Sequence, residues 1–154
     1  HYSYTSYVPG DEWKKVNLPY DWSVGLPYDS ISGEGCVAFL QGGIGWYSKS
    51  FPTTISANQK CYIVFDGVYN NSEYWINGKK LGYHPSGYAP FYFDVTDYLN
   101  PNEDNRMTVR VDHSHYADSR WYTGSGIYKG CEMIVTEQTA YSGLGNICHY
   151  SRGY

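Results

Sequence analysis

The sequence is poor in the features that would place it in a membrane, on nucleic acid or in a helical bundle. Its 154 residues contain no run of about 18 apolar residues, the length a membrane-spanning helix needs. Lys and Arg number 11 against 15 Asp and Glu, a net charge of −4, so a basic surface for nucleic acid or anionic lipid is missing. Only two Met are present, whereas there are 19 Tyr and 17 Gly. This composition favours strands and turns over helices.

Closely spaced cysteines are missing as well. The four cysteines are Cys36, Cys61, Cys131 and Cys148, and no two form a CxxC metal or redox motif. Their even number fits two disulfides in an oxidising compartment, and four reduced thiols in the cytosol are the alternative. Three disulfide connectivities are open. We adopt the disulfide interpretation and expect a secreted protein, extracellular or periplasmic.

What the sequence does contain is a succession of short β-type runs, each ended by turn residues. They lie at residues 46–51, 60–65, 72–76, 79–83, 91–95, 106–111 and 131–136. In the sixth run, Met107, Val109 and Val111 alternate with polar residues and form one apolar face. Asn77-Gly78, between the third and fourth runs, predicts a hairpin with a type I′ turn. Short strands about ten residues apart without helices between them predict an all-β sandwich or barrel.

The regular pattern covers most of the chain but not its end. Trp46 and Trp75 lie within the β-type runs, and we expect both to pack in the core. We predict one domain over residues 1–139 and a tail rich in Gly and Tyr over 140–154. No internal repeat and no Pro-rich or Ser-rich linker divides the chain.

Four stretches, taken together, resemble a known family. They are VNLPYDWSV at 16–24, GGIGWYSKSF at 42–51, FDGVYNNSEYWINGKKLGYHPSGYAPFYFDVTDYL at 65–99 and MTVRVDHSHYADSRWYTGSGIYKGCEMIVT at 107–136. In this order and spacing they resemble the N-terminal sugar-binding domain of glycoside hydrolase family 2, the family of β-galactosidases, β-glucuronidases and β-mannosidases. The resemblance implies a jelly-roll β-sandwich of the galactose-binding type, which agrees with the strand pattern.

The resemblance also implies that catalysis takes place elsewhere. In that family both catalytic glutamates lie on a separate (β/α)8 barrel, so we expect no catalytic residue here and no hydrolysis by this chain alone. Within a larger protein, the chain would be part of a family 2 glycoside hydrolase. Hydrolysis needs two carboxylates side by side, whereas Asp66, Asp94 and Asp112 stand at separate strand ends, where turn and capping roles explain them. The family places its loops, here 84–91 and 118–128, at the rim of the active site.

Aromatic and polar residues in these two loops are the candidates for sugar contact. A pyranose ring stacks its C–H face on an aromatic side chain, while polar side chains bond its hydroxyls. The residues that supply such a surface are Tyr88 and Phe91 in the first loop and Arg120, Trp121 and Tyr122 in the second. Packing within the core or between loops is the alternative for Phe91 and Trp121.

The same stretches contain candidates for metal and modification sites. Asp112, His113, His115 and Asp118 have the residue types of a metal site, but a solvated loop after a strand explains them, and we predict no metal. A structural calcium ion, held by carbonyls and carboxylates, is the one cofactor left open. Asn70-Asn71-Ser72 is a glycosylation sequon with Asn70 as the acceptor, and an ordinary polar turn is the alternative.

The sequence leads to one main functional hypothesis and two alternatives. The first is a non-catalytic carbohydrate-recognition domain, whose partner is a carbohydrate. The second is a structural subunit of an extracellular filament, in which the tail adds a strand to a neighbouring copy. The third is a fragment of a complete β-galactosidase-like enzyme, with downstream glycosidase domains as its partners.

Overall fold

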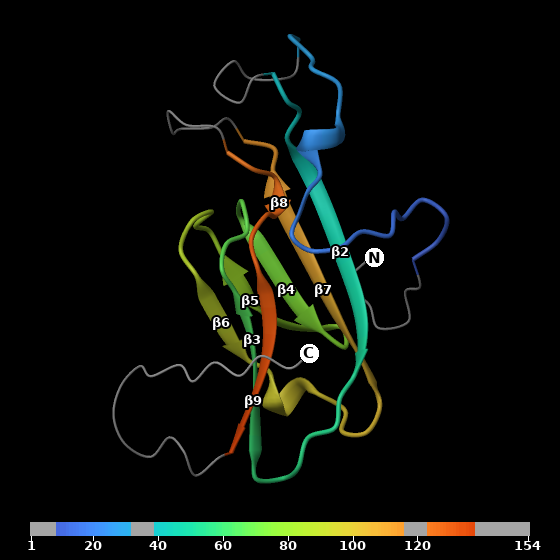
Figure 1. Cartoon of the computed structure of the whole chain (residues 1–154), viewed down its shortest axis with the longest axis vertical. Helices are drawn as coiled ribbons and strands as arrows, with labels where there is room; N and C mark the ends of the chain where they lie inside the picture. Colours follow the sequence, from blue (N-terminus) through green and yellow to red (C-terminus); the bar gives the residue numbers. More distant parts are fainter. Residues whose placement is uncertain (1–8, 32–38, 116–122, 138–154) are drawn as a thin grey trace.

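The computed structural model describes residues 9–31, 39–115 and 123–137, and these form a β-sandwich (Figure 1). Its strands are β1 (Tyr20–Asp21), β2 (Gly43–Pro52), β3 (Gln59–Phe65), β4 (Ser72–Ile76), β5 (Lys79–His84), β6 (Phe91–Asp94), β7 (Asp104–His113), β8 (Gly126–Ile127) and β9 (Cys131–Glu137). The 3-10 helices η1 (Ser23–Gly25) and η3 (Thr96–Tyr98) are the only helical elements of the described residues. No helix among them is long and apolar enough to cross a membrane.

The strands pair into two main sheets and one short ribbon. The larger sheet has the order β2-β7-β4-β5, the smaller one the order β6-β3-β9, and β1 pairs with β8. Every pairing is antiparallel. The two sheets lie face to face, as the jelly-roll prediction requires. The predicted all-β jelly-roll fold is therefore confirmed.

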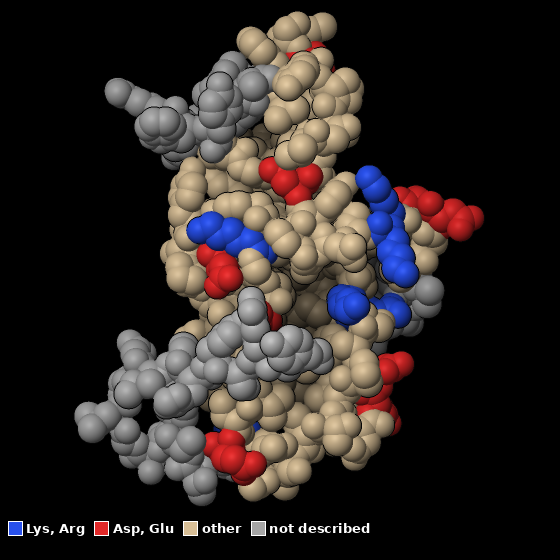
Figure 2. All heavy atoms as spheres, in the orientation of Figure 1, with Lys and Arg blue, Asp and Glu red and all other residues tan. Residues whose placement is uncertain are grey.

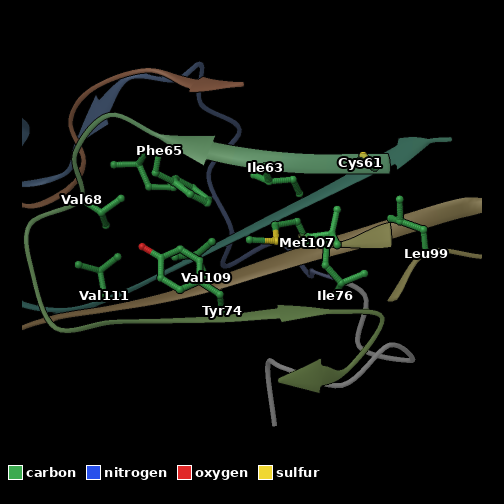
Figure 3. Close-up of a cluster of buried hydrophobic side chains, with 12 residues drawn as sticks. Cys61, Ile63, Phe65, Val68, Tyr74, Ile76, Leu99, Met107, Val109 and Val111 are labelled. Carbon is green, nitrogen blue, oxygen red and sulfur yellow. The ribbon is translucent and has the colours of Figure 1, made fainter. Parts of the chain in front are cut away.

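Alternate residues of the facing strands form the core, as Figure 3 shows. Met107, Val109 and Val111 of β7 are at most 7% exposed, so the apolar face predicted for this strand is the buried one. Ile63 and Phe65 of β3 pack against them from the smaller sheet. Burial of this alternating set fixes the register, because a slip by one residue would turn the apolar side chains outward.

The hairpin at Asn77-Gly78 has the predicted geometry. Both residues have positive φ, 50° and 77°, as a type I′ turn requires. The Asn77 side chain also donates to the carbonyl of Tyr98 and accepts from the amide of Arg106 at 2.9 Å. The turn is thus tied to both η3 and β7.

The two tryptophans expected in the core lie on the outer face of the larger sheet. Trp46 of β2 and Trp75 of β4 stack on each other across β7, with ring centroids 5.6 Å apart. Trp75 is only 9% exposed, so it is buried without being part of the core between the sheets. The expected burial is confirmed for Trp75, whereas neither ring packs between the sheets. Alternation separates the two faces of a strand but does not tell which face an isolated aromatic occupies.

The disulfide prediction is wrong for the two cysteines that the structure describes. Cys61 faces Val135 across the β3–β9 pair and Cys131 faces Phe65, about 13 Å away along the strands. Both are free thiols, and burial raises the pKa of Cys61 to about 11 and that of Cys131 to about 12. They therefore remain protonated at neutral pH. Cys36 and Cys148 lie outside the described residues, as does the predicted tail.

Candidate functional site

The two loops singled out in the sequence meet at one end of the sandwich. The first joins β5 to β6, and the described part of the second, from Thr123, leads through β8 to β9. The Tyr128 hydroxyl of the second loop donates to the carbonyl of Gly87 in the first at 2.8 Å. Tyr69, between β3 and β4, forms an isolated backbone bridge with Gly126. Three segments far apart in sequence are thereby joined into one surface.

Tyr88 is an exposed aromatic residue in the described part of this surface. The residue is 53% exposed, and its ring meets that of Tyr69 edge-on with centroids 5.6 Å apart. Tyr69 in turn packs edge-on against His113 at 4.8 Å. The Ser86 hydroxyl accepts the amide of Tyr88 at 3.3 Å and so holds the turn that presents the ring. A Cβ on Gly87 would lie 2.1 Å from the Tyr69 ring, so this close contact requires glycine.

Phe91 has a different environment from Tyr88. It is half-buried in β6, where its ring stacks on His84 at 3.8 Å and on Phe65 at 5.2 Å. Both contacts use the ring faces that a sugar would stack on. Sugar contact by Phe91 stays a prediction, as it does for Tyr88. Arg120, Trp121 and Tyr122 lie outside the described residues.

A buried hydroxyl and imidazole network supports the loops from below. Ser23 of η1 donates to the Ser125 hydroxyl, which bonds His113 Nδ1 at 2.7 Å. The three side chains are 4%, 1% and 7% exposed, so no substrate reaches the Ser125 hydroxyl, and the network serves as a support. Sequence reasoning missed it, because residues 23 and 125 carry no shared motif and meet only in the fold.

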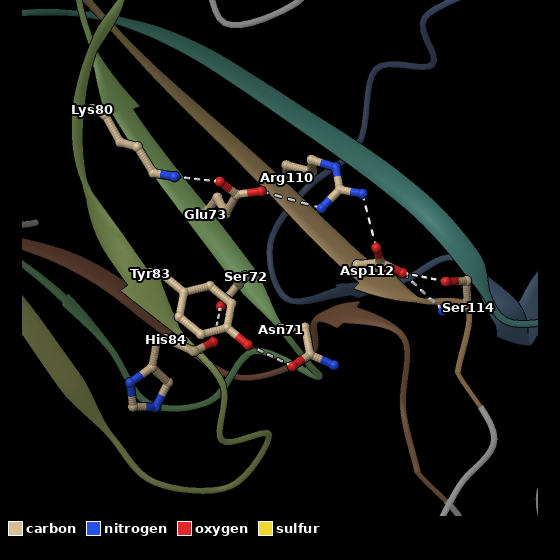
Figure 4. Close-up of polar contacts among 9 residues, drawn as sticks. All are labelled: Asn71, Ser72, Glu73, Lys80, Tyr83, His84, Arg110, Asp112 and Ser114. Atoms are coloured by element: carbon tan, nitrogen blue, oxygen red, sulfur yellow. Dashed lines mark hydrogen bonds and ion pairs between the residues drawn. The ribbon is translucent and has the colours of Figure 1, made fainter.

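A ladder of charged side chains crosses the outer face of the larger sheet toward this end (Figure 4). Glu73 of β4 pairs with Lys80 of β5 and, at 3.2 Å, with Arg110 of β7. Arg110 pairs in turn with Asp112 at 2.8 Å, and Asp112 accepts the amide of Ser114 at 3.1 Å. The ladder therefore fixes the point at which the chain leaves β7 for the second loop.

Asp112 is a carboxylate whose hydrogen bonds hold the chain at the end of a strand. Burial opposes its ionisation, but the hydrogen bonds from Ser114 and the guanidinium of Arg110 outweigh burial and hold its pKa below the ordinary value. Asp94 follows the same pattern at the end of β6, where it accepts the amide of Thr96 at 3.0 Å. Among the described residues no three His, Cys, Asp or Glu side chains group as a metal site would require.

Asn70 lies beside the site, in the turn before β4. It is half-buried, its carbonyl accepts the amide of Asp112 at 3.1 Å, and its side-chain oxygen is buried with no partner in the described part of the chain. Glycosylation at Asn70 stays a prediction.

Comparisons with known proteins identify the family of the chain. Residues 11–137 match the family model of glycosyl hydrolases family 2, sugar binding domain. The chain is 41% identical over 138 residues to the β-galactosidase BoGH2A of Bacteroides ovatus, covering 88% of this chain and 16% of that enzyme. It is 28% identical over 150 residues to a β-glucuronidase of Bacteroides fragilis, covering 94% of this chain and 21% of that enzyme.

A solved structure extends the likeness to the fold. The crystal structure of a β-glycosidase from Bacteroides vulgatus superposes with a TM-score of 0.79 at 43% identity, over 88% of this chain and 18% of that one. The chain thus spans less than a quarter of each of these relatives. It carries the sugar-binding domain of glycosyl hydrolases family 2 and belongs to that family.

Proposed function

We propose that this chain is the non-catalytic carbohydrate-recognition part of a family 2 glycosidase and that its loop end contacts the sugar. The observation that carries the proposal is the junction of the two loops, made by the hydrogen bond from Tyr128 to Gly87. The junction presents the exposed Tyr88 ring on a surface supported by Tyr69 and His113. An exposed, fixed aromatic ring is what a pyranose requires of its binding surface.

The substrate class follows from the relatives. Their names include a β-galactosidase and a β-glucuronidase, so β-galactosides and β-glucuronides are the sugars to test. A glucuronide carries a carboxylate, which an arginine binds with paired hydrogen bonds. Arg120 is the residue of the second loop with this chemistry. If the sugar is a glucuronide, replacing Arg120 weakens its binding and leaves galactoside binding unchanged.

Calorimetric titration of the whole chain with methyl β-galactoside and methyl β-glucuronide tests the proposal. We expect binding of one of them in the millimolar range and no release of nitrophenol from the matching nitrophenyl glycosides. Tyr88→Ala should weaken binding about threefold to tenfold, as expected for the loss of an aromatic contact worth about 0.5–1.5 kcal/mol.

Tyr92→Ala is the matched control. Tyr92 is 67% exposed but lies in β6, where its ring contacts Tyr62 of the smaller sheet. Its loss should leave sugar binding unchanged. Absence of binding at millimolar sugar, or equal effects of the two tyrosine variants, would contradict the proposal. Hydrolysis by the purified chain would contradict its non-catalytic part.

A further inference from the structure

A cleft of about 710 Å³ opens the core on the side opposite the β5–β6 side of the sandwich. Its walls are β2, the edge strand of the larger sheet, β9, the edge strand of the smaller one, and the segment Trp13–Leu18, which precedes β1. Core side chains of both sheets, among them Phe65 and Val109, line its floor. This cleft is separate from the loop end, where Tyr88 and Tyr69 lie, and its role goes beyond the proposed sugar contact.

In the described part of the chain the inner face of β9 is only partly covered along this cleft. Met133 and Val135 stand opposite Ile63 and Cys61 of β3, which are 5% and 0% exposed, so all four point to the inside of the sandwich. Met133 is nevertheless 46% exposed and Val135 41%. In the described part of the chain β9 pairs only with β3, so its other edge also keeps free backbone donors and acceptors. An inner face and a backbone edge left open side by side favour one more strand.

The charges around the cleft indicate the chemistry of that strand. Lys14, Lys15 and Lys49 line the cleft against one acid, Glu132. The chain as a whole has only 11 basic residues and a net charge of −4, so this is a local concentration of positive charge. Figure 2 shows Lys and Arg side chains gathered on the side of the molecule where β2 runs, with acidic side chains beside them toward the outer edge. Positive charge at the rim of an apolar cleft attracts an acidic partner.

We propose that the cleft binds an extended peptide strand of a partner, with apolar side chains facing the core and acidic ones facing the lysines. The lining residues Trp46–Phe51 of β2 extend about 20 Å, the length of about six residues of strand. The strand pairs with the free edge of β9, and its apolar side chains cover Met133. This mode of binding gives affinity through the backbone and selectivity through alternate side chains.

Fluorescence anisotropy of the whole chain with a labelled eight-residue peptide tests the proposal. In this probe Glu alternates with Val and Phe, and a companion peptide carries Lys in place of Glu. We expect the Glu peptide to bind at least about tenfold more tightly than the Lys peptide at low salt, with a smaller difference at high salt. Hydrogen exchange should slow at the amides of β9 when the Glu peptide binds.

Variants of the protein test whether the peptide binds in the cleft or on another surface. Met133→Asp places a charge inside the cleft and should weaken binding of the Glu peptide at least about tenfold. Lys49→Glu should weaken binding of the Glu peptide and strengthen binding of the Lys peptide. Val24→Asp is the matched control, because Val24 is 74% exposed in η1 and outside the cleft lining. Lys49→Glu changes an exposed side chain, so it tests the charge requirement even if Met133→Asp fails to fold.

Three outcomes would overturn the proposal. One is the absence of binding by the Glu peptide, and another is equal weakening by Met133→Asp and Val24→Asp. The third is binding that appears only after residues 138–154 are removed or after a dimer dissociates. In that case the cleft belongs to the chain's own tail or to a second copy, and not to a separate partner. Sugar titration is independent of all three, so the proposed function can fail or hold separately.

Discussion

The two ends of the sandwich are held together in different ways. At the hairpin end, Asn77 and Asn105 join their side chains at 2.6 Å, and Asn105 also bonds the backbone of Asn100 and Glu103. These contacts join residues that are 2 to 28 positions apart in sequence. At the loop end, Ser23 meets Ser125 and Tyr128 meets Gly87, so the contacts link distant segments. The end with no proposed function is thus held by contacts of shorter sequence range than the end that carries the candidate site, where the contacts span 41 and 102 positions.

The largest expected effect is on the hairpin end. Asn105 is fully buried and makes four side-chain hydrogen bonds, so Asn105→Ala leaves several buried groups without partners. We expect a loss of about 3–4 kcal/mol in the free energy of unfolding, measured by urea titration. Asn58→Ala, which removes an exposed hydrogen bond to Glu137, is the control and should cost less than about 0.5 kcal/mol. Equal losses would mean that the asparagine network does not hold this end.

A smaller effect with a functional consequence is expected at the loop end. Gly87→Ala forces the Tyr69 ring to move, because the new Cβ would lie 2.1 Å from it. We expect a loss of about 1–3 kcal/mol in stability and weaker sugar binding, since Tyr69 supports Tyr88. Gly25→Ala is the control, because a Cβ there meets no atom within 4 Å. Unchanged sugar binding in Gly87→Ala would mean that the position of the Tyr69 ring does not matter for sugar binding at the candidate site.

The smallest effect concerns the charged ladder and depends on pH. The pKa of Asp112 is held low, so its contribution to stability is present above its unfolded pKa of about 3.9 and is lost as pH falls through the folded pKa. Arg110→Gln should raise the pKa of Asp112, so acid unfolding should begin at a higher pH than in the parent chain. Circular dichroism between about pH 2 and pH 6 measures this shift. Lys80→Gln is the control, because Lys80 lies at the exposed end of the ladder and does not contact Asp112.

The sequence predicted most of the fold for local physical reasons. Alternation located β7 and its buried face, and Asn77-Gly78 located the hairpin, because both signals lie within a few residues of the chain. β1 and η1 were missed because two or three residues carry no period. The outward position of Trp46 was missed because the face of β2 that turns toward the core depends on its pairing with β7, which is distant in sequence.

The candidate site was predictable only in part. The family resemblance pointed to the two loops, and the structure joins them through Tyr128 and Gly87. The support given by Ser23, Ser125 and His113 could not be predicted, because serine and histidine in loops have many roles and nothing local selects one. The partly open inner face of β9 could not be predicted either, because it depends on which strands of the larger sheet lie opposite this edge strand.

The contact between Ser23 and Ser125 also bears on how the protein is made. It joins residues 102 positions apart, and β1 has β8 as its partner. A ribosome adds about 5–20 residues per second, so β1 and η1 wait about 5–20 s for the segment that completes them. During that interval β2 to β7 can already pair. The loop end therefore assembles late during synthesis, and any sugar-binding surface on it forms only after β8 has emerged.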